Sequence, residues 1–125
     1  GVPKSLPSLV KASRIQDKAK AVGFDWENAD QVWEKVQEEL AELQKEIKDN
    51  SSKSEIVSEF GDVLFSLINY ARFLDIDPDE ALEKTNKKFI SRFQFMETKA
   101  KGLNRTIHDL SIEEMNLYWN QAKIQ

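Results

Sequence analysis

The feature that most constrains the fold is the helical spacing of apolar residues in two neighbouring segments. In residues 36–47, VQEELAELQKEI, aliphatic side chains recur every three or four positions and form one stripe. Residues 55–74, EIVSEFGDVLFSLINYARFL, show the same spacing and carry further aromatic residues on other faces. A helix that is apolar nearly all round lies at the centre of a bundle or against another subunit. The predicted stripes are Val36, Leu40, Leu43 and Ile47, and Ile56, Phe60, Val63, Leu67, Ala71 and Leu74.

Start and stop signals divide the chain into about five helices. In DIDPDEAL, Asp77 is expected as a cap, Pro78 as the first helical residue and Glu80 as the partner of the cap. No segment alternates apolar and polar residues with the period of a strand. The sequence therefore predicts an all-α helical bundle in one domain, residues 1–125. The helices are expected at about 5–23 (Pro7 in the first turn, Gly23 at the end), 28–49, 52–74 (capped by Ser52 with Glu55), 78–102 and 111–123.

The charge and residue content narrow the kind of site that the chain can hold. With 18 basic and 22 acidic residues, the net charge of -4 offers no basic surface for nucleic acid. The absence of cysteine excludes thiolate metal sites and fits a reducing compartment. The one histidine, His108, is expected as a solvated loop residue or a local cap. Neither a run of 18 apolar residues nor a signal peptide is seen, so we expect a cytoplasmic protein without a membrane partner.

Acidic residues border the two central stripes. At roughly 100° per residue, Glu39 and Glu42 share one ridge beside the first stripe. Glu59 and Asp62 lie on a matching ridge of the next helix, so the four carboxylates would face one another if the helices are antiparallel neighbours. Burying a lone carboxylate costs several kcal/mol unless it is paired or bound to a metal. Four carboxylates without histidine or thiol ligands suit Mg²⁺, Mn²⁺ or Ca²⁺.

The same acids also have an ordinary interpretation. Acidic residues three and four positions apart are common on solvated helix faces, and Lys35 could neutralise Glu39 as an i, i+4 partner. A di-iron bundle is excluded because it needs a Glu-x-x-His pair on two helices. The ridge argument alone therefore leaves both a metal site and a solvated acidic face open.

Basic and aromatic residues form a second candidate group nearer the C-terminus. Lys88 and Arg92 lie one turn apart on the shoulder of the fourth predicted helix, where they could offset the charge of a phosphate substrate. Trp119 and Lys123 could stack on a base and hold a phosphate. A solvated basic face and a core tryptophan are the alternative explanations.

The acids EELAE and EFGD form the pattern E-E-x-x-E … E-x-x-D. This pattern resembles the motif of the all-α nucleoside triphosphate pyrophosphohydrolases of the MazG family. The resemblance implies a helical bundle that dimerises through its central helices and binds Mg²⁺, with Mn²⁺ as a possible substitute. It implies hydrolysis of nucleoside triphosphates between the α- and β-phosphates. Four longer segments are similar to the C-terminal domain of two-domain MazG proteins: LPSLVKASRIQDKAKAVGFDW, EFGDVLFSLINYARFL, DPDEALEKTNKKFISRF and YWNQAK.

Site roles follow from the resemblance position by position. Every position of the motif is filled, so an active enzyme is expected. The chain begins where the linker of the larger members would end, which implies an excised half of a two-domain protein. The implied roles are metal binding for Glu39, Glu42, Glu59 and Asp62, catalysis for Glu38 (orienting or activating water) and Glu39, and substrate binding for Lys35, Lys88, Arg92 and Trp119.

Three alternatives to this enzyme remain at the level of sequence. The chain could be a helical interaction module, a nucleotide sensor without turnover, or a phosphoribosyl-ATP pyrophosphohydrolase, which has a related fold and related chemistry. Because the sequence reveals no hydrogen-bonding pocket for a base, loose aromatic stacking and broad base specificity are expected of the enzyme.

Overall fold

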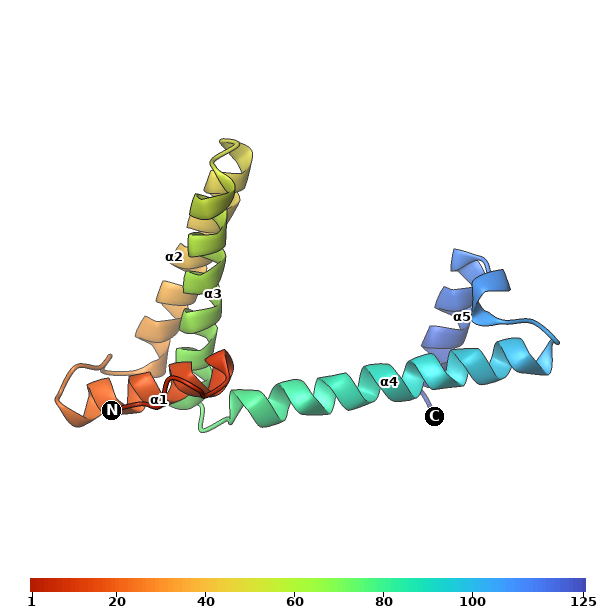
Figure 1. Cartoon of the computed structure of the whole chain (residues 1–125), viewed down its shortest axis with the longest axis horizontal. Helices are drawn as coiled ribbons and strands as arrows, with labels where there is room; N and C mark the ends of the chain where they lie inside the picture. Colours follow the sequence, from red (N-terminus) through yellow and green to blue (C-terminus); the bar gives the residue numbers. More distant parts are fainter. The chain divides into compact units, whose positions relative to one another are not determined.

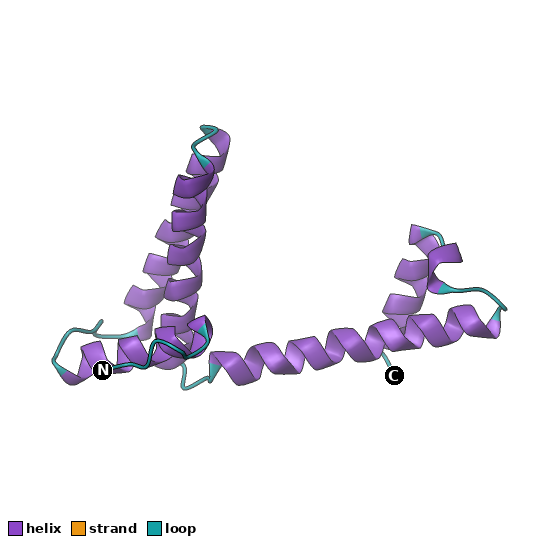
Figure 2. Ribbon diagram, in the orientation of Figure 1, coloured by secondary structure: helices purple, strands orange, loops and turns teal.

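The computed structural model describes residues 1–125 as helices joined by short loops, with no strand (Figure 2). The all-α prediction is confirmed. The chain forms two compact units, Gly1–Asp79 and Glu80–Gln125. None of the helices combines the length and apolarity that crossing a membrane requires. The elements are α1 (Ser8–Ala21), α2 (Ala29–Lys48), α3 (Lys53–Phe73), α4 (Pro78–Gly102), the short 3₁₀ helix η1 (Ile107–Asp109) and α5 (Ile112–Ala122) (Figure 1).

Side-chain caps fix most helix starts where the sequence predicts them. The Ser52 hydroxyl accepts a hydrogen bond from the Glu55 amide, and the Asp77 carboxylate accepts one from the Asp79 amide. Such bonds satisfy amides that have no partner within their own helix. The first helix differs from the prediction, because Pro7 precedes α1 as its cap residue instead of lying in its first turn.

The first four helices end in the same backbone motif. After α1, the amide of Gly23 (φ +90°) donates to the Lys20 carbonyl and the next amide donates to the Ala19 carbonyl. This is the Schellman arrangement, which needs a residue in the left-handed region. Glycine adopts that region without strain, and asparagine and aspartate tolerate it. The corresponding residues after α2, α3 and α4 are Asn50, Asp75 and Asn104.

The core of the first unit lies between α2 and α3, which run side by side in opposite directions, with α1 packed against α3 (Figure 1). On α2 the buried residues are Val32, Val36, Glu39 and Leu43. Their spacing of three or four positions defines one face of the helix. Glu39 is therefore a carboxylate at a position where the core would otherwise hold an apolar side chain.

The predicted apolar stripes are wrong in part. Val36, Leu43 and Val63 are buried, but Leu40 and Ile47 on α2 remain 42% and 52% exposed. On α3 the buried face includes Ser66 and Asn69. A helix that is apolar on several faces does not reveal which of them meets its neighbour, because periodicity fixes only the spacing. The exposed members of the α3 stripe are Phe60 at 54%, Leu67 at 42% and Leu74 at 46%.

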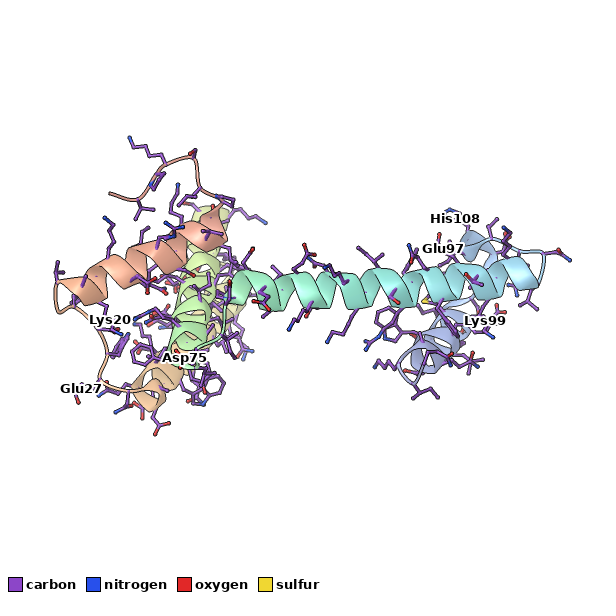
Figure 3. The ribbon with its side chains drawn as sticks, turned by 90° about the horizontal axis from the view of Figure 1, so that it is seen from below. Lys20, Glu27, Asp75, Glu97, Lys99 and His108 are labelled. Atoms are coloured by element: carbon purple, nitrogen blue, oxygen red, sulfur yellow. The ribbon has the colours of Figure 1, made fainter.

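The core of the second unit is small. Met96 and Ala100 on α4 and Leu110 before α5 are buried. Three further large apolar residues of α4, Leu82, Phe89 and Phe93, are exposed. His108 lies in η1 and is exposed (Figure 3), which confirms that it is a solvated residue.

An ion pair joins the end of α4 to the start of α5. The Arg105 guanidinium donates to both carboxylate oxygens of Glu114, at 2.6 and 3.0 Å. Glu114 also completes a reciprocal capping box with Ser111. Arg105, followed by the Ser111 amide, lowers the pKa of Glu114 from about 4.5 to about 2. The pair therefore holds the first turn of α5 in place through bonds to the ionised carboxylate.

Glu114→Gln is expected to lower the thermal stability of the chain at pH 7 and to have a much smaller effect near pH 2.5. The lowered pKa means that the contribution of Glu114 is present above pH 4.5 and is lost as the pH falls toward 2. Thermal unfolding followed by circular dichroism at both pH values measures this. Glu113→Gln, at the exposed neighbouring position, is the matched control; an equal loss in both variants would contradict the prediction.

Candidate metal centre and adjoining cavity

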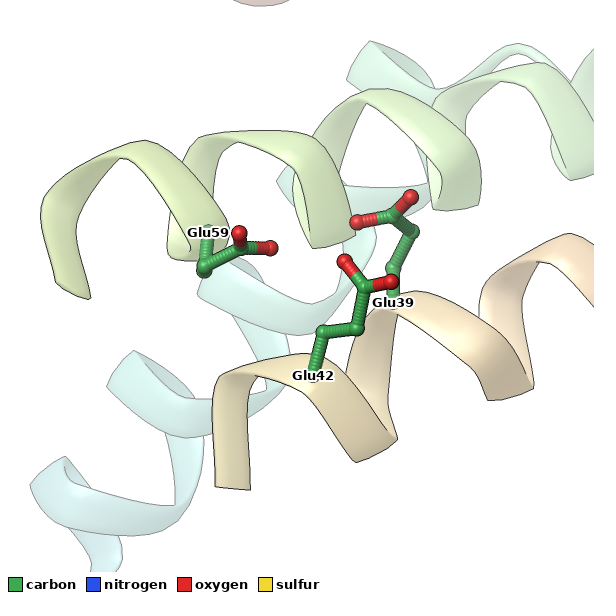
Figure 4. A group of neighbouring side chains, drawn as sticks. All are labelled: Glu39, Glu42 and Glu59. Atoms are coloured by element: carbon green, nitrogen blue, oxygen red, sulfur yellow. The ribbon is translucent and has the colours of Figure 1, made fainter. Parts of the chain in front are cut away.

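Three glutamates from two helices converge in the first unit. Glu39 and Glu42 on α2 and Glu59 on α3 each place a carboxylate oxygen within 4.8 Å of the other two (Figure 4). The i, i+3 spacing on α2 puts Glu39 and Glu42 on one ridge, and the antiparallel α3 brings Glu59 opposite them. Three of the four predicted metal ligands thus come together across the helix pair.

Two oxygens of this cluster have no hydrogen-bond partner although they are buried. They are Oε2 of Glu39 and Oε2 of Glu59, and the side chain of Glu39 is only 8% exposed. A buried polar atom without a partner costs free energy, so such atoms are rare unless a ligand or ion satisfies them. Oxygen donors in a group of carboxylates are the ligands preferred by hard divalent cations. The cluster therefore fits a hard divalent cation.

The raised pKa of Glu59 also indicates an excess of negative charge at the cluster. Burial raises the pKa of the Glu59 carboxyl, and the charges of Glu42, Asp62, Glu39 and Glu46 raise it further. Both causes disfavour the ionised form, because a charge loses solvation and meets other negative charges. A bound cation would reverse the second cause. The chain thus concentrates negative charge at this point without enough positive charge to offset it.

Lys35 is the only basic residue that forms an ion pair with Glu39. Its Nζ lies 2.9 Å from Glu39 Oε1 and 3.6 Å from Glu38 Oε1. The hydrogen bond to Glu39 is the main reason why the pKa of Lys35 is raised. The i, i+4 pairing considered from the sequence is therefore present, but it leaves the second oxygen of Glu39 unsatisfied. Glu38 points to the exterior, with its side chain 57% exposed.

Lys35→Met is expected to destabilise the metal-free chain by about 2 kcal/mol, because it leaves the buried Glu39 carboxylate without a counter-charge. The same variant should gain more stability from added Mg²⁺ than the wild type gains. Thermal unfolding with EDTA and with millimolar MgCl₂ measures both effects. Lys45→Met, at an exposed position of the same helix, is the control. A smaller gain from Mg²⁺ in Lys35→Met than in the wild type would refute this role of Lys35.

A cavity of about 580 Å³ extends from the acidic cluster along α3. Asp62 lies on its wall together with Lys35 and Glu39. Asp62, the fourth predicted metal ligand, is exposed and does not belong to the cluster of three glutamates. Its charge nevertheless raises the pKa of Glu59. The remaining lining residues are Ile15, Gln16, Ala19, Phe24, Asp25, Trp26, Val32, Phe65, Ser66, Asn69 and Arg72.

The sequence does not predict part of this cavity. Arg72 bonds both oxygens of Asp25, at 3.1 and 2.6 Å, and thereby ties the loop before α2 to α3. This pair lowers the pKa of Asp25. The sequence contains no signal that Asp25 and Gln16 reach this cavity. Contacts between residues this far apart depend on how the helices pack.

The basic and aromatic candidates lie in the second unit. The guanidinium of Arg92 sits over the Trp119 ring, 5.4 Å from its centroid, and the Phe89 ring is 5.2 Å from the same tryptophan. Lys88 is exposed one turn earlier on α4. Arg92 and Trp119, two of the residues expected to bind the substrate, are therefore in contact with each other.

The donor atoms of the acidic cluster are all carboxylate oxygens, and they come from the two antiparallel helices α2 and α3. The fold and this cluster define an all-α domain with a site suited to a hard cation. Residues 27–95, more than half of the chain, match the MazG nucleotide pyrophosphohydrolase domain. The chain belongs to the MazG family. The acidic cluster and most of the residues around it fall within the matched segment.

Curated relatives extend the similarity over almost the whole chain. It is 46% identical over 118 residues to the nucleoside triphosphate pyrophosphohydrolase/pyrophosphatase MazG of Thermotoga maritima, covering 94% of this chain and 45% of that protein. It is 39% identical over 127 residues to the nucleoside triphosphate pyrophosphohydrolase of Escherichia coli, covering 99% of this chain and 48% of that protein. An uncharacterized Bacillus subtilis protein, YabN, is 48% identical over 122 residues, a quarter of its length. The chain therefore spans about half the length of the first two relatives.

Proposed function

We propose that this chain hydrolyses nucleoside triphosphates between the α- and β-phosphates, with Mg²⁺ as its cofactor and Mn²⁺ as a possible substitute. The observation that carries the proposal is the glutamate cluster, in which two buried oxygens have no partner. Relatives matched over nearly the whole chain are named nucleoside triphosphate pyrophosphohydrolases, which supports the same activity. Nucleoside triphosphates are abundant in the cytoplasm, and we propose that the enzyme works there.

The acids have distinct roles in this reaction. Glu39, Glu42, Glu59 and Asp62 would hold the metal, which supplies Lewis acidity and offsets the charge of the triphosphate when it is bound. Glu38, an exposed acid beside the cluster on α2, would orient the attacking water and accept its proton. The water oxygen then forms the new bond to the α-phosphorus as the bond to the bridging oxygen breaks. Nucleoside monophosphate and pyrophosphate are the products.

The cationic residues would hold the charged part of the substrate. Lys35 reaches the cluster and can exchange its bond to Glu39 for one to a phosphate oxygen. Lys88 and Arg92 carry the charge that a triphosphate requires, and Trp119 offers an aromatic face for the nucleotide. We also propose a broad base specificity.

A second copy of the chain is proposed to cover the exposed face of α3, giving a homodimer through the central helices. Val57, Phe60, Leu64 and Leu67 follow one another at three or four positions and are 42–58% exposed. An apolar face of this extent is typical of a protein interface. Light scattering should give the mass of a dimer for the wild type and of a monomer for Leu64→Glu. Val22→Glu is the control, and a monomeric wild type would contradict the proposal.

A product assay tests the activity itself. The purified chain is incubated with each common ribo- and deoxyribonucleoside triphosphate, with MgCl₂ or with EDTA, and the products are separated by ion-exchange chromatography. We expect monophosphate and pyrophosphate from all of them, and only with the metal. Diphosphate and phosphate would place the cut at the wrong bond. Binding without turnover would favour a nucleotide sensor, and no binding would favour an interaction module.

A further inference from the structure

The cavity beside the acidic cluster contains a buried hydrogen-bond acceptor without a partner. It is Oε1 of Gln16, a residue on α1 that is only 5% exposed and lines the cavity. The amide nitrogen of Gln16 donates to the Phe65 carbonyl at 3.0 Å. Since a carbonyl can only accept, this bond fixes which way the amide faces. Its oxygen is therefore a fixed acceptor that needs an N–H or O–H donor.

A second amide on the cavity wall has the complementary property. Asn69 is 8% exposed, and its Oδ1 accepts bonds from two nitrogens of Arg72, at 3.1 and 2.7 Å. Because a guanidinium can only donate, the oxygen of Asn69 must face Arg72. The amide nitrogen of Asn69 makes no hydrogen bond within the chain and remains as a donor. The two amides thus offer the cavity one acceptor and one donor, each held in its orientation by a neighbour.

The position and size of the cavity suit the nucleoside end of the proposed substrate. Asp62, Phe65, Ser66, Asn69 and Arg72 follow α3 away from the acidic cluster, a distance of about 15 Å at 1.5 Å per residue. A volume of about 580 Å³ lies in the range of small-molecule sites. Aromatic and aliphatic side chains line much of the rest, which suits a flat ring. Phosphates at the acids would leave the base beside Gln16.

We propose that this cavity binds the base of the nucleotide and that Gln16 Oε1 accepts a hydrogen bond from the Watson–Crick edge of that base. Every common base carries at least one N–H donor and one acceptor on this edge. The pair formed by Gln16 and Asn69 can therefore engage all of them, which reconciles a polar pocket with broad base specificity. The inference rests on the proposed function, because it takes a nucleotide as the substrate.

Uracil provides a sharp test, because its ring N3–H is its only N–H donor. Pyrophosphate release from UTP is compared with release from 3-methyl-UTP, in which a methyl group replaces that hydrogen. Leaving the buried acceptor unpaired should lower kcat/KM by about tenfold or more. The size control is 5-methyl-UTP, which keeps the N3–H and should react within about twofold of UTP.

Gln16→Leu separates the hydrogen bond from a steric effect of the methyl group. The variant keeps the side-chain volume and removes the acceptor, so the difference between UTP and 3-methyl-UTP should shrink to about twofold or less. A discrimination that persists in Gln16→Leu would assign the effect to another wall of the cavity and overturn the proposal. Equal rates for UTP and 3-methyl-UTP in the wild type would overturn it without any variant.

A binding measurement keeps the inference separate from the proposed activity. Calorimetry with UMP and 3-methyl-UMP in the presence of MgCl₂ requires no turnover. Tighter binding of UMP, lost in Gln16→Leu, would support the base site even if no triphosphate were hydrolysed. Hydrolysis of UTP combined with equal binding of the two monophosphates would leave the proposed function standing and remove the role of Gln16.

Discussion

Glu39→Gln is expected to lower pyrophosphate release by at least about a hundredfold while the fold remains intact. Glu39 is the buried member of the cluster, and its Oε2 has no partner within the chain. The amide keeps the size of the side chain but offers one neutral oxygen in place of a charged pair. The metal would lose a ligand at the point where the reacting phosphate is held. Steady-state rates over a range of MgCl₂ concentrations measure the effect.

The matched control for this variant is Glu34→Gln. Glu34 lies on the same helix and is exposed, so the same chemical change there should leave the rate within about twofold. Circular dichroism establishes that both variants keep their helices. Full activity of Glu39→Gln at every Mg²⁺ concentration would remove Glu39 from the mechanism. A loss that high Mg²⁺ restores would identify metal affinity as the defect.

Glu59→Gln should make the metal-free chain more stable at pH 7 and abolish most of the stabilisation by Mg²⁺. Burial and neighbouring carboxylates raise the pKa of Glu59, so the folded chain binds its proton more tightly than the unfolded chain does. The contribution of Glu59 to stability is therefore present below pH 4.5 and is lost as the pH rises through the raised pKa. At neutral pH the charged side chain opposes folding, and glutamine removes that opposition.

Thermal unfolding with and without Mg²⁺ measures both parts of this prediction. At a Mg²⁺ concentration a hundredfold above its dissociation constant, the wild type gains about 2.7 kcal/mol by mass action. Glu59→Gln should start from a higher melting temperature in EDTA and gain much less from the metal. The advantage in EDTA should also disappear near pH 4. Glu34→Gln is again the control, and a lower melting temperature of Glu59→Gln in EDTA would refute the electrostatic argument.

The sequence predicts the helices well because their ends depend on local chemistry. Ser52 and Asp77 cap the helices at which they were expected, since a cap bonds an amide only a few residues away. The convergence of Glu39 and Glu42 with Glu59 was also predictable, because helical rotation and one antiparallel neighbour determine it. The roles of all the site residues in metal binding, catalysis and substrate binding stay predictions.

The packing of individual faces could not be predicted in the same way. Phe60 and Leu67 have the spacing of core residues, but α2 and α1 contact other faces of α3. An apolar helix face can lie either in the core of one chain or in the interface between two chains. The spacing of apolar residues alone therefore does not distinguish core residues from interface residues. No feature of the sequence marks Gln16 as a cavity residue, because its orientation depends on a hydrogen bond to a carbonyl of α3, far away in the chain.

The clustered glutamates all belong to a single antiparallel pair of helices joined by a turn at residues 49–52. Few residues separate the two arms, so the entropy lost on closing the loop between them is small. Contacts of low sequence separation also form early in folding. The carboxylates can therefore assemble as soon as the pair of helices docks, and a cation present at that moment would favour the native register over alternatives.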